Sequence, residues 1–127
     1  MPGPENHVNN RIRFITHQGK SVLLVDLTNC TAAEVGVIAR RVPEFVTAEP
    51  LGSALVLGDF TGAQFDREAI DSIKESAVFD RPHIRKSAWV GLENLPHVLY
   101  ENMKSFTRRT LPTFKTREEA LDWLVKE

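Results

Sequence analysis

The chain has 127 residues, of which 42% are hydrophobic and 26% charged, and both fractions are ordinary for one soluble globular domain. Sixteen Lys and Arg residues against seventeen Asp and Glu residues give a net charge of -1, which argues against nucleic acid as the main partner because phosphate binding needs a basic excess. Cys30 is the only cysteine, so the sequence contains neither a disulfide framework nor a cysteine-rich metal site.

The start of the chain is polar and rich in proline and glycine, so we expect residues 1–10 to form a flexible arm and residues 11–127 to form a single domain. The arm lacks the basic start and apolar stretch of a secretion signal, and no apolar run in the chain approaches the length of a membrane span. The sequence therefore predicts a cytoplasmic protein without a membrane span.

Two strands at the start of the domain are predicted to form a hairpin. Residues 11–17 alternate between polar and apolar side chains, as in an edge strand with one solvent-exposed face. Residues 21–27 are apolar without interruption over much of their length, as in a strand that is covered on both faces. The short connection between them contains Gly19, which favours a tight antiparallel turn.

The first predicted helix follows Thr31, with Glu34 three residues later in the arrangement of a capping box. Its apolar residues repeat at helical spacing as far as Val42. Pro43 removes a backbone N–H donor, so we expect a kink at this residue or a division into two helical pieces.

Strands and helices alternate over the rest of the chain. We predict strands at 53–58, 83–91 and 113–115, and helices at 66–78, at 95–109 and after the N-cap Thr116. The order of elements is β-β-α-β-α-β-α-β-α. Alternation of this kind implies right-handed crossovers and a mainly parallel sheet of about five strands, with the first strand as the antiparallel exception. The sequence therefore predicts a single α/β domain.

Acidic and threonine side chains follow three of the predicted strands: Asp26 and Thr28, then Asp59 and Thr61, and finally Thr116. The carboxyl ends of parallel strands open on one edge of the sheet, where α/β proteins place their binding sites. We therefore expect these side chains to form a rim along that edge. The same residue types also end strands and cap helices in any protein, so a purely structural role is the alternative.

The segment Asp59-Phe60-Thr61-Gly62 allows more than one chemical interpretation. A phosphoaspartate nucleophile of the haloacid-dehalogenase type needs a second Asp where Thr61 stands and a magnesium-binding Asp pair further along the chain, which the sequence lacks. A receiver-type phosphoacceptor domain needs two adjacent acids at one strand end, whereas Asp26 is single and the chain starts with a hairpin. Neither interpretation fits the whole chain.

The order of elements and several segments of the sequence resemble the SpoIIAA-like family, a STAS-related group that is linked by fold to the CRAL-TRIO lipid-transfer domains. The segments are GKSVLLVDL, PLGSALVLGDFTGAQFD, IRKSAWVG, LPHVLY and FKTREEALDWLV, and the match covers residues 11–125. In the STAS domains of anti-sigma-factor antagonists a strand ends in Asp-Ser-Ser/Thr-Gly, and the third residue is a regulatory phosphoacceptor at a helix N-terminus. The resemblance implies that Asp59, Thr61 and Gly62 form such a loop, with Phe60 in place of the small hydroxyl residue.

The resemblance also implies a bacterial, non-enzymatic module that regulates or binds a protein partner and needs no cofactor. Phosphorylation of Thr61 would switch this contact, because a phosphate there would rest on unpaired N–H groups at the positive end of a helix. The sequence leaves open whether the protein forms a homodimer. No nucleophile, base and oxyanion donor converge by sequence spacing, so we expect no enzymatic activity.

By analogy with CRAL-TRIO domains, the alternative function is a carrier or sensor of an apolar small molecule or lipid. It predicts an apolar pocket between the sheet and the helix at 95–109, lined by Trp89, Leu95, Leu99, Met103 and Phe106. The four histidines are scattered along the chain without ligand spacing, so no metal site is expected.

Overall fold

The structure is a computed structural model in which residues 10–92 and 112–126 are described. Its elements are, in chain order, β1 (Ile12–His17), β2 (Lys20–Asp26), α2 (Ala32–Val46), β3 (Ala54–Asp59), α3 (Arg67–Asp80), the 3-10 turn η1 (Arg81–His83), β4 (Ile84–Val90), β5 (Thr113–Phe114) and α5 (Arg117–Val125). Most of the predicted arm and the whole of the predicted helix at 95–109 lie outside the described residues.

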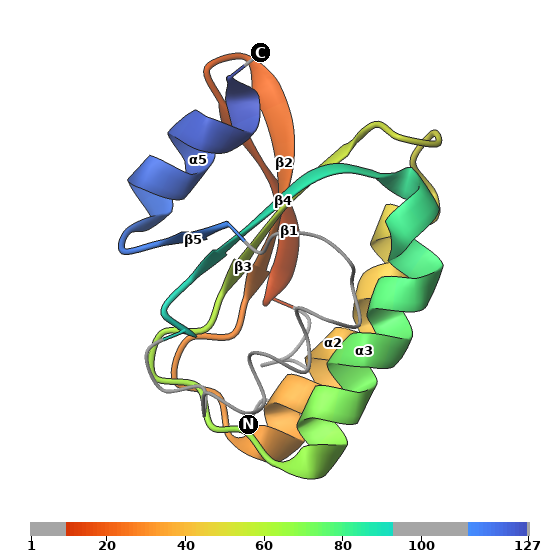
Figure 1. Cartoon of the computed structure of the whole chain (residues 1–127), viewed down its shortest axis with the longest axis vertical. Coiled ribbons are helices and arrows are strands. Elements are labelled where there is room, and N and C mark those ends of the chain that lie inside the picture. Colours follow the sequence, from red (N-terminus) through yellow and green to blue (C-terminus); the bar gives the residue numbers. More distant parts are fainter. Residues whose placement is uncertain (1–9, 93–111, 127) are drawn as a thin grey trace.

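A five-stranded sheet forms the middle of the molecule, with strand order β1-β2-β3-β4-β5. β1 pairs with β2 in antiparallel orientation, whereas β2, β3, β4 and β5 run parallel to one another. Figure 1 shows α2 and α3 side by side on one face of the sheet and α5 on the other. The predictions of an α/β fold and of a mainly parallel sheet with an antiparallel first strand are therefore confirmed.

The continuous apolar run of β2 is explained by burial on both faces of the sheet. Leu23 and Val25 belong to the core beneath α2 and α3, whereas Val22 and Leu24 belong to the core beneath α5. Alternate side chains of a strand point to opposite faces, so a strand between two helical layers needs apolar residues at every position. β1 lies at the edge of the sheet, and Ile12 is its one fully buried residue.

α2 continues through Pro43, so the predicted division into two helical pieces is wrong. A proline has no N–H, and Pro43 therefore leaves the carbonyl oxygen of Ala39 without its donor inside the helix. The buried hydroxyl of Ser76 on α3 donates a hydrogen bond to this oxygen. The neighbouring helix thus supplies the missing donor, and the carbonyl oxygen of Ala39 keeps a hydrogen-bond partner.

The face of α3 toward α2 is partly polar. Its buried residues include Ser72, Ser76 and Asp80. Ser72 accepts a hydrogen bond of 3.0 Å from the guanidinium of Arg40 on α2. The contact between the two helices is therefore held by hydrogen bonds as well as by apolar packing.

Asp80, the last residue of α3, is a buried carboxylic acid. It is 5% exposed, and its Oδ1 atom has no hydrogen-bond partner among the described residues. Burial disfavours the charged form and raises the pKa of Asp80 to about 7, although the nearby charge of His83 acts in the opposite direction. Asp80 therefore changes its charge near neutral pH.

The C-terminal end of α5 is held by two lysines from the sheet. Lys20 of β2 donates a hydrogen bond of 3.0 Å to the carbonyl oxygen of Val125. Lys86 of β4 donates to the carbonyl oxygens of Trp123 and Lys126, at 3.3 and 2.5 Å. Because α5 has no basic residue in its own last turn, these lysines supply the positive charge that the end of a helix favours.

Candidate functional site

Two aspartates end neighbouring parallel strands. Asp26 is the last residue of β2 and Asp59 the last residue of β3, and the two are partners in the pairing of these strands. Backbone hydrogen bonds join the loops that follow, from Leu27 N to Asp59 O at 2.8 Å and from Asn29 N to Thr61 O at 2.9 Å. The carboxyl edge of the sheet therefore continues as a pair of adjoining loops.

Each aspartate forms the same turn with the threonine two residues later. Oδ1 of Asp26 accepts hydrogen bonds from the backbone N–H and the hydroxyl of Thr28, at 3.1 and 2.6 Å. Oδ1 of Asp59 accepts the same pair from Thr61, at 3.0 and 2.7 Å. Aspartate side chains commonly close turns in this way at the ends of strands. The pattern Asp-x-Thr thus occurs twice at this edge, and Thr61 is the more exposed of the two threonines.

Arg117 joins the two aspartates. It is the first residue of α5, and its Nε lies 2.5 Å from Oδ2 of Asp59 while its Nη2 lies 3.2 Å from Oδ1 of Asp26. The Asp59 side chain is only 5% exposed, and a carboxylate buried to this degree needs a charged partner. We refer to Asp26, Thr28, Asp59, Thr61 and Arg117 as the rim.

The pKa shifts at the rim follow from these ion pairs. Burial alone would raise the pKa of Asp26, but the hydrogen bonds from Thr28 and the charge of Arg117 outweigh it and lower the pKa. The charge of Arg11 acts in the same direction. Burial alone would lower the pKa of Arg117, but its hydrogen bonds and ion pairs with Asp59 and Asp26 raise it. Asp26 and Arg117 are therefore both charged at neutral pH.

Two further arginines lie beside the rim, in and just before β1. Nη1 of Arg11 lies 3.4 Å from Oδ1 of Asp26 and donates to the carbonyl oxygen and the hydroxyl of Thr28, at 2.9 and 3.2 Å. Nη1 of Arg13 lies 4.0 Å from Oδ2 of Asp26. The guanidinium groups of Arg11, Arg13 and Arg117 therefore face the carboxylates of two residues, Asp26 and Asp59. The net charge of this cluster is positive.

The backbone of Thr61 is fixed by Gly91, which follows β4. Gly91 has a φ of 76°, and a Cβ atom there would lie 2.4 Å from both N and Oγ1 of Thr61. Glycine alone leaves room for this contact and adopts this backbone conformation without strain. The backbone of Gly91 therefore lies directly against Thr61, and any larger residue would displace it.

Phe60 belongs to the hydrophobic core and not to the rim. The residue is 4% exposed, and its ring stacks on that of Trp89 with 5.0 Å between ring centres and 11° between planes. The ring centre of Phe65 is 5.7 Å away, and the Phe60 ring also lies against Gly58. A small hydroxyl residue at this position would leave the space empty.

Thr61 does not lie at the N-terminus of α3. The helix begins at Arg67, and the side chain of Asp66 caps it with a hydrogen bond of 2.7 Å. In the loop between them, the N–H groups of Thr61, Ala63 and Gln64 are already bonded to oxygen atoms of the protein. The expected position of Thr61 at the N-terminus of a helix is therefore wrong, whereas the binding of a phosphate there by unpaired N–H groups stays a prediction.

Thr116 caps α5, where its hydroxyl accepts a hydrogen bond of 3.2 Å from Glu119 N. The residue that joins the rim is the next one, Arg117, which the sequence analysis missed. The sequence contains one signal for this role of Arg117. The first turn of a helix disfavours positive charge, so an arginine at this position indicates a specific anionic partner.

The apolar pocket predicted for a carrier stays a prediction. Leu95, Leu99, Met103 and Phe106 lie outside the described residues. The remaining member of the set, Trp89, is half-buried, and Phe60 covers its ring on the side of α2 and α3.

Neither a metal centre nor a membrane segment is found in residues 10–92 and 112–126. Across these ranges, no group of three or more His, Cys, Asp or Glu side chains is placed to hold a metal ion, and no helix is long and apolar enough to cross a lipid bilayer. Comparisons of the chain with protein-family models, with curated proteins and with solved structures gave no match. Function has to be inferred from the site itself.

Proposed function

We propose that the protein is a STAS-like, non-enzymatic module that binds a protein partner through the rim, and that phosphorylation of Thr61 switches this contact. The observation that carries the proposal is the setting of Thr61. The residue is solvent-exposed, yet it is hydrogen-bonded to Asp59 and to the backbone of the adjoining loop, and Gly91 lies against it. A modifying enzyme needs an accessible hydroxyl group, and a binding partner favours a surface that is already ordered.

A phosphate on Thr61 would change the charge and the hydrogen bonds of the rim. The hydroxyl hydrogen that now bonds to Asp59 would be lost, and a group with a charge of about -2 would face that carboxylate. Arg117 bonds to the other oxygen of the same carboxylate, so its guanidinium is close enough to pair with the phosphate instead. Phosphorylation would therefore replace the ion pair between Arg117 and Asp59 by an ion pair between Arg117 and the phosphate.

Affinity capture from cells of the source organism tests the proposal, with the wild-type protein, Thr61→Ala and Thr61→Glu as baits. Thr16→Glu on β1 is a matched control, because it adds the same charge at an exposed threonine near the opposite edge of the sheet. We expect a protein whose recovery changes at least about fivefold with Thr61→Glu and stays constant with Thr16→Glu. A set of captured proteins that is the same for every bait would overturn the proposal.

A further inference from the structure

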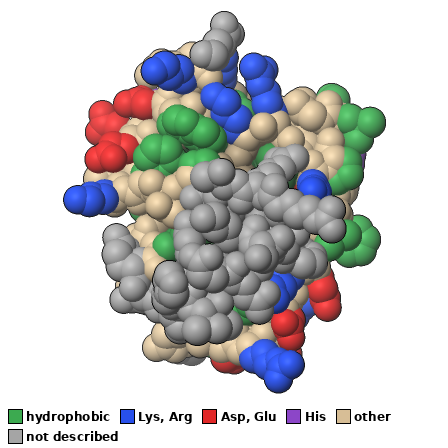
Figure 2. Space-filling view, in the orientation of Figure 1, with side chains coloured by type: hydrophobic (Ala, Val, Ile, Leu, Met, Phe, Trp, Pro, Cys, Tyr) green, Lys and Arg blue, Asp and Glu red, His purple; other side chains and the backbone are tan. Residues whose placement is uncertain are grey.

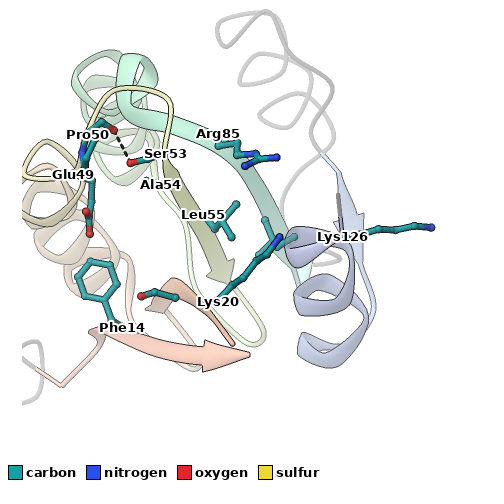
Figure 3. A pocket seen from close by; sticks show the side chains of 11 residues that line it. Phe14, Lys20, Glu49, Pro50, Ser53, Ala54, Leu55, Arg85 and Lys126 are labelled. Atoms are coloured by element: carbon teal, nitrogen blue, oxygen red, sulfur yellow. Dashed lines mark hydrogen bonds between the residues drawn. The ribbon is translucent and has the colours of Figure 1, made fainter. Parts of the chain in front are cut away.

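A hollow of about 410 Å³ opens to solvent at the edge of the sheet opposite the rim. It lies where β2, β3 and β4 begin, between the loop that follows α2 and the end of α5 (Figure 3). The lining residues with a chemical role are Phe14, Lys20, Glu49, Leu55, Arg85 and Lys126. None of them belongs to the rim, so the hollow is independent of the proposed switch at Thr61.

A bulge in β4 helps to form the hollow. Two pairs of partners flank the bulge: Ala54 with Ile84, and Leu55 with Lys86. Arg85 has no partner in β3 and is therefore an extra residue in β4. An extra residue of this kind turns its side chain out of the regular alternation of the strand, and bulges occur often beside binding sites.

The two ends of the hollow differ in character. In Figure 3, Lys20 and Arg85 from different strands point toward the side of α5, with Leu55 between them. Phe14 is 47% exposed and lies at the other end, below Glu49. The basic end attracts an anion, Glu49 repels it from the other end, and the apolar surface between them can cover an uncharged group.

Basic side chains are prominent on this part of the surface. Figure 2 shows Lys and Arg side chains gathered at the end of the molecule where α5 ends. Within the described part of the chain, the guanidinium of Arg85 and the ammonium of Lys126 have no hydrogen-bond or ion-pair partner, and Glu49 is the one acidic side chain in the lining. Lys20 is held in place by its hydrogen bond to Val125. An anion would therefore meet a positioned lysine and an arginine that can turn toward it.

We propose that this hollow binds a small organic anion, namely a carboxylate or phosphate monoester attached to an aromatic or short aliphatic group. Arg85 bonds the anionic oxygen atoms with its planar guanidinium, and Lys20 adds a second positive charge. The apolar part of the ligand lies on Leu55 and extends toward Phe14. A volume of about 410 Å³ falls at the lower end of the range of small-molecule sites, which suits a ligand of this size.

NMR titration of the isotope-labelled full chain tests the proposal. The probes are phenyl phosphate, phenylacetate, benzyl alcohol, benzylammonium and inorganic phosphate. We expect phenyl phosphate or phenylacetate to shift the amide signals of Phe14, Leu55 and Arg85, with a Kd of about 1 mM or tighter, and to leave that of Thr61 unchanged. The neutral and cationic probes lack the negative charge, and inorganic phosphate lacks the apolar part, so each should bind at least about tenfold more weakly.

The relative affinity of the two organic anions decides between a phosphate monoester and a carboxylate as the ligand class. Arg85→Gln should weaken binding of the preferred anion about tenfold, whereas Arg41→Gln, at another site on α2, should leave it unchanged. The proposal is overturned if neither organic anion binds, if benzylammonium binds as tightly as the preferred organic anion, or if Arg85→Gln binds that anion like the wild type. Thr61→Glu should leave every titration unchanged. A negative result for the hollow therefore says nothing about the proposed switch at Thr61, and the reverse also holds.

Discussion

The guanidinium of Arg117 bonds to a carboxylate at the end of β3, with its Nε 2.5 Å from Oδ2 of Asp59. The same guanidinium reaches Asp26 at 3.2 Å, so one side chain from the first turn of α5 holds the ends of β2 and β3 together. α5 covers the face of the sheet opposite α2 and α3 (Figure 1). This pair of contacts therefore links the α5 layer to the loops of the rim.

Replacement of Arg117 by glutamine should lower the free energy of unfolding by about 2 to 3 kcal/mol. The variant Arg117→Gln leaves the buried carboxylate of Asp59 without a charged partner, and the partial exposure of Arg117 keeps the loss below that of a fully buried pair. Urea denaturation followed by circular dichroism measures the change. Arg41→Gln is the control, because Arg41 pairs with Glu44 at 3.9 Å on the surface of α2, and it should cost under about 0.5 kcal/mol. Equal urea midpoints for the two variants would show that the ion pairs of Arg117 do not contribute to the stability of the fold.

Gly91→Ala should destabilise the protein more than Gly19→Ala. Both glycines have a positive φ, 76° and 79°, so both substitutions carry a similar backbone strain of about 1 kcal/mol. A Cβ atom at Gly19 meets no atom within 4 Å, whereas one at Gly91 would lie 2.4 Å from N and Oγ1 of Thr61. We expect Gly91→Ala to cost about 2 kcal/mol more in urea denaturation and to shift the amide signal of Thr61. Indistinguishable results for the two alanine variants would mean that Gly91 does not fix Thr61.

Asp80 should make the protein less stable as the pH rises toward and past neutrality. Burial raises its pKa to about 7, so between the ordinary carboxyl pKa and this value the folded state binds a proton that the unfolded state has already released. Stability is therefore highest below the unfolded pKa, falls as the pH rises between the two pKa values, and levels off above the folded one. The total loss is on the order of 2 to 4 kcal/mol.

The variant Asp80→Asn isolates this loss, because its amide does not titrate. Its stability relative to the wild type should increase between about pH 5 and about pH 8, and the comparison cancels any constant cost of burying the amide. The charge of His83 favours the ionised acid, so His83→Gln should raise the pKa of Asp80 further, which increases the total loss of stability and moves it to higher pH. A stability difference between Asp80→Asn and the wild type that is equal at both pH values would rule out titration of Asp80 in this range.

Local patterns in the sequence predict most of the fold. The capping box of Thr31 and Glu34 is present, with hydrogen bonds of 2.9 and 3.2 Å, because both partners lie within one helical turn. The apolar run of β2 predicts burial on both of its faces, and both faces are covered. The acids at the ends of β2 and β3 could be placed together because parallel strands end at one edge of a sheet.

Contacts between distant residues could not be predicted in the same way. The donation from Ser76 to the Ala39 carbonyl depends on how α2 packs against α3, and the bridge from Arg117 on how α5 packs against the sheet. The position of Arg117 in the first turn of its helix indicates an anionic partner, but no local pattern says which residues supply it. Phe60 shows the same limit. In the sequence it stands out only as a departure from the motif, whereas the fold turns its ring into the core.

Phe60→Ser, which introduces the small hydroxyl residue of the STAS motif, should lower the free energy of unfolding by about 3 to 5 kcal/mol. The ring of Phe60 fills the space between Trp89, Phe65 and Gly58, so serine would leave a cavity and a buried hydroxyl group. Phe60→Leu keeps much of the apolar volume and should cost under about 2 kcal/mol.

Urea denaturation followed by tryptophan fluorescence measures both Phe60 variants, in a Trp123→Phe background that leaves Trp89 as the one remaining tryptophan. The emission of Trp89 should also change in the folded state of Phe60→Ser, because its stacking partner is removed. Equal stability of the serine and leucine variants would mean that the core does not need the ring. In that case the turn between Asp59 and Thr61 could accept the STAS motif without loss, and Phe60 would have to be explained by the surface of the rim and not by packing.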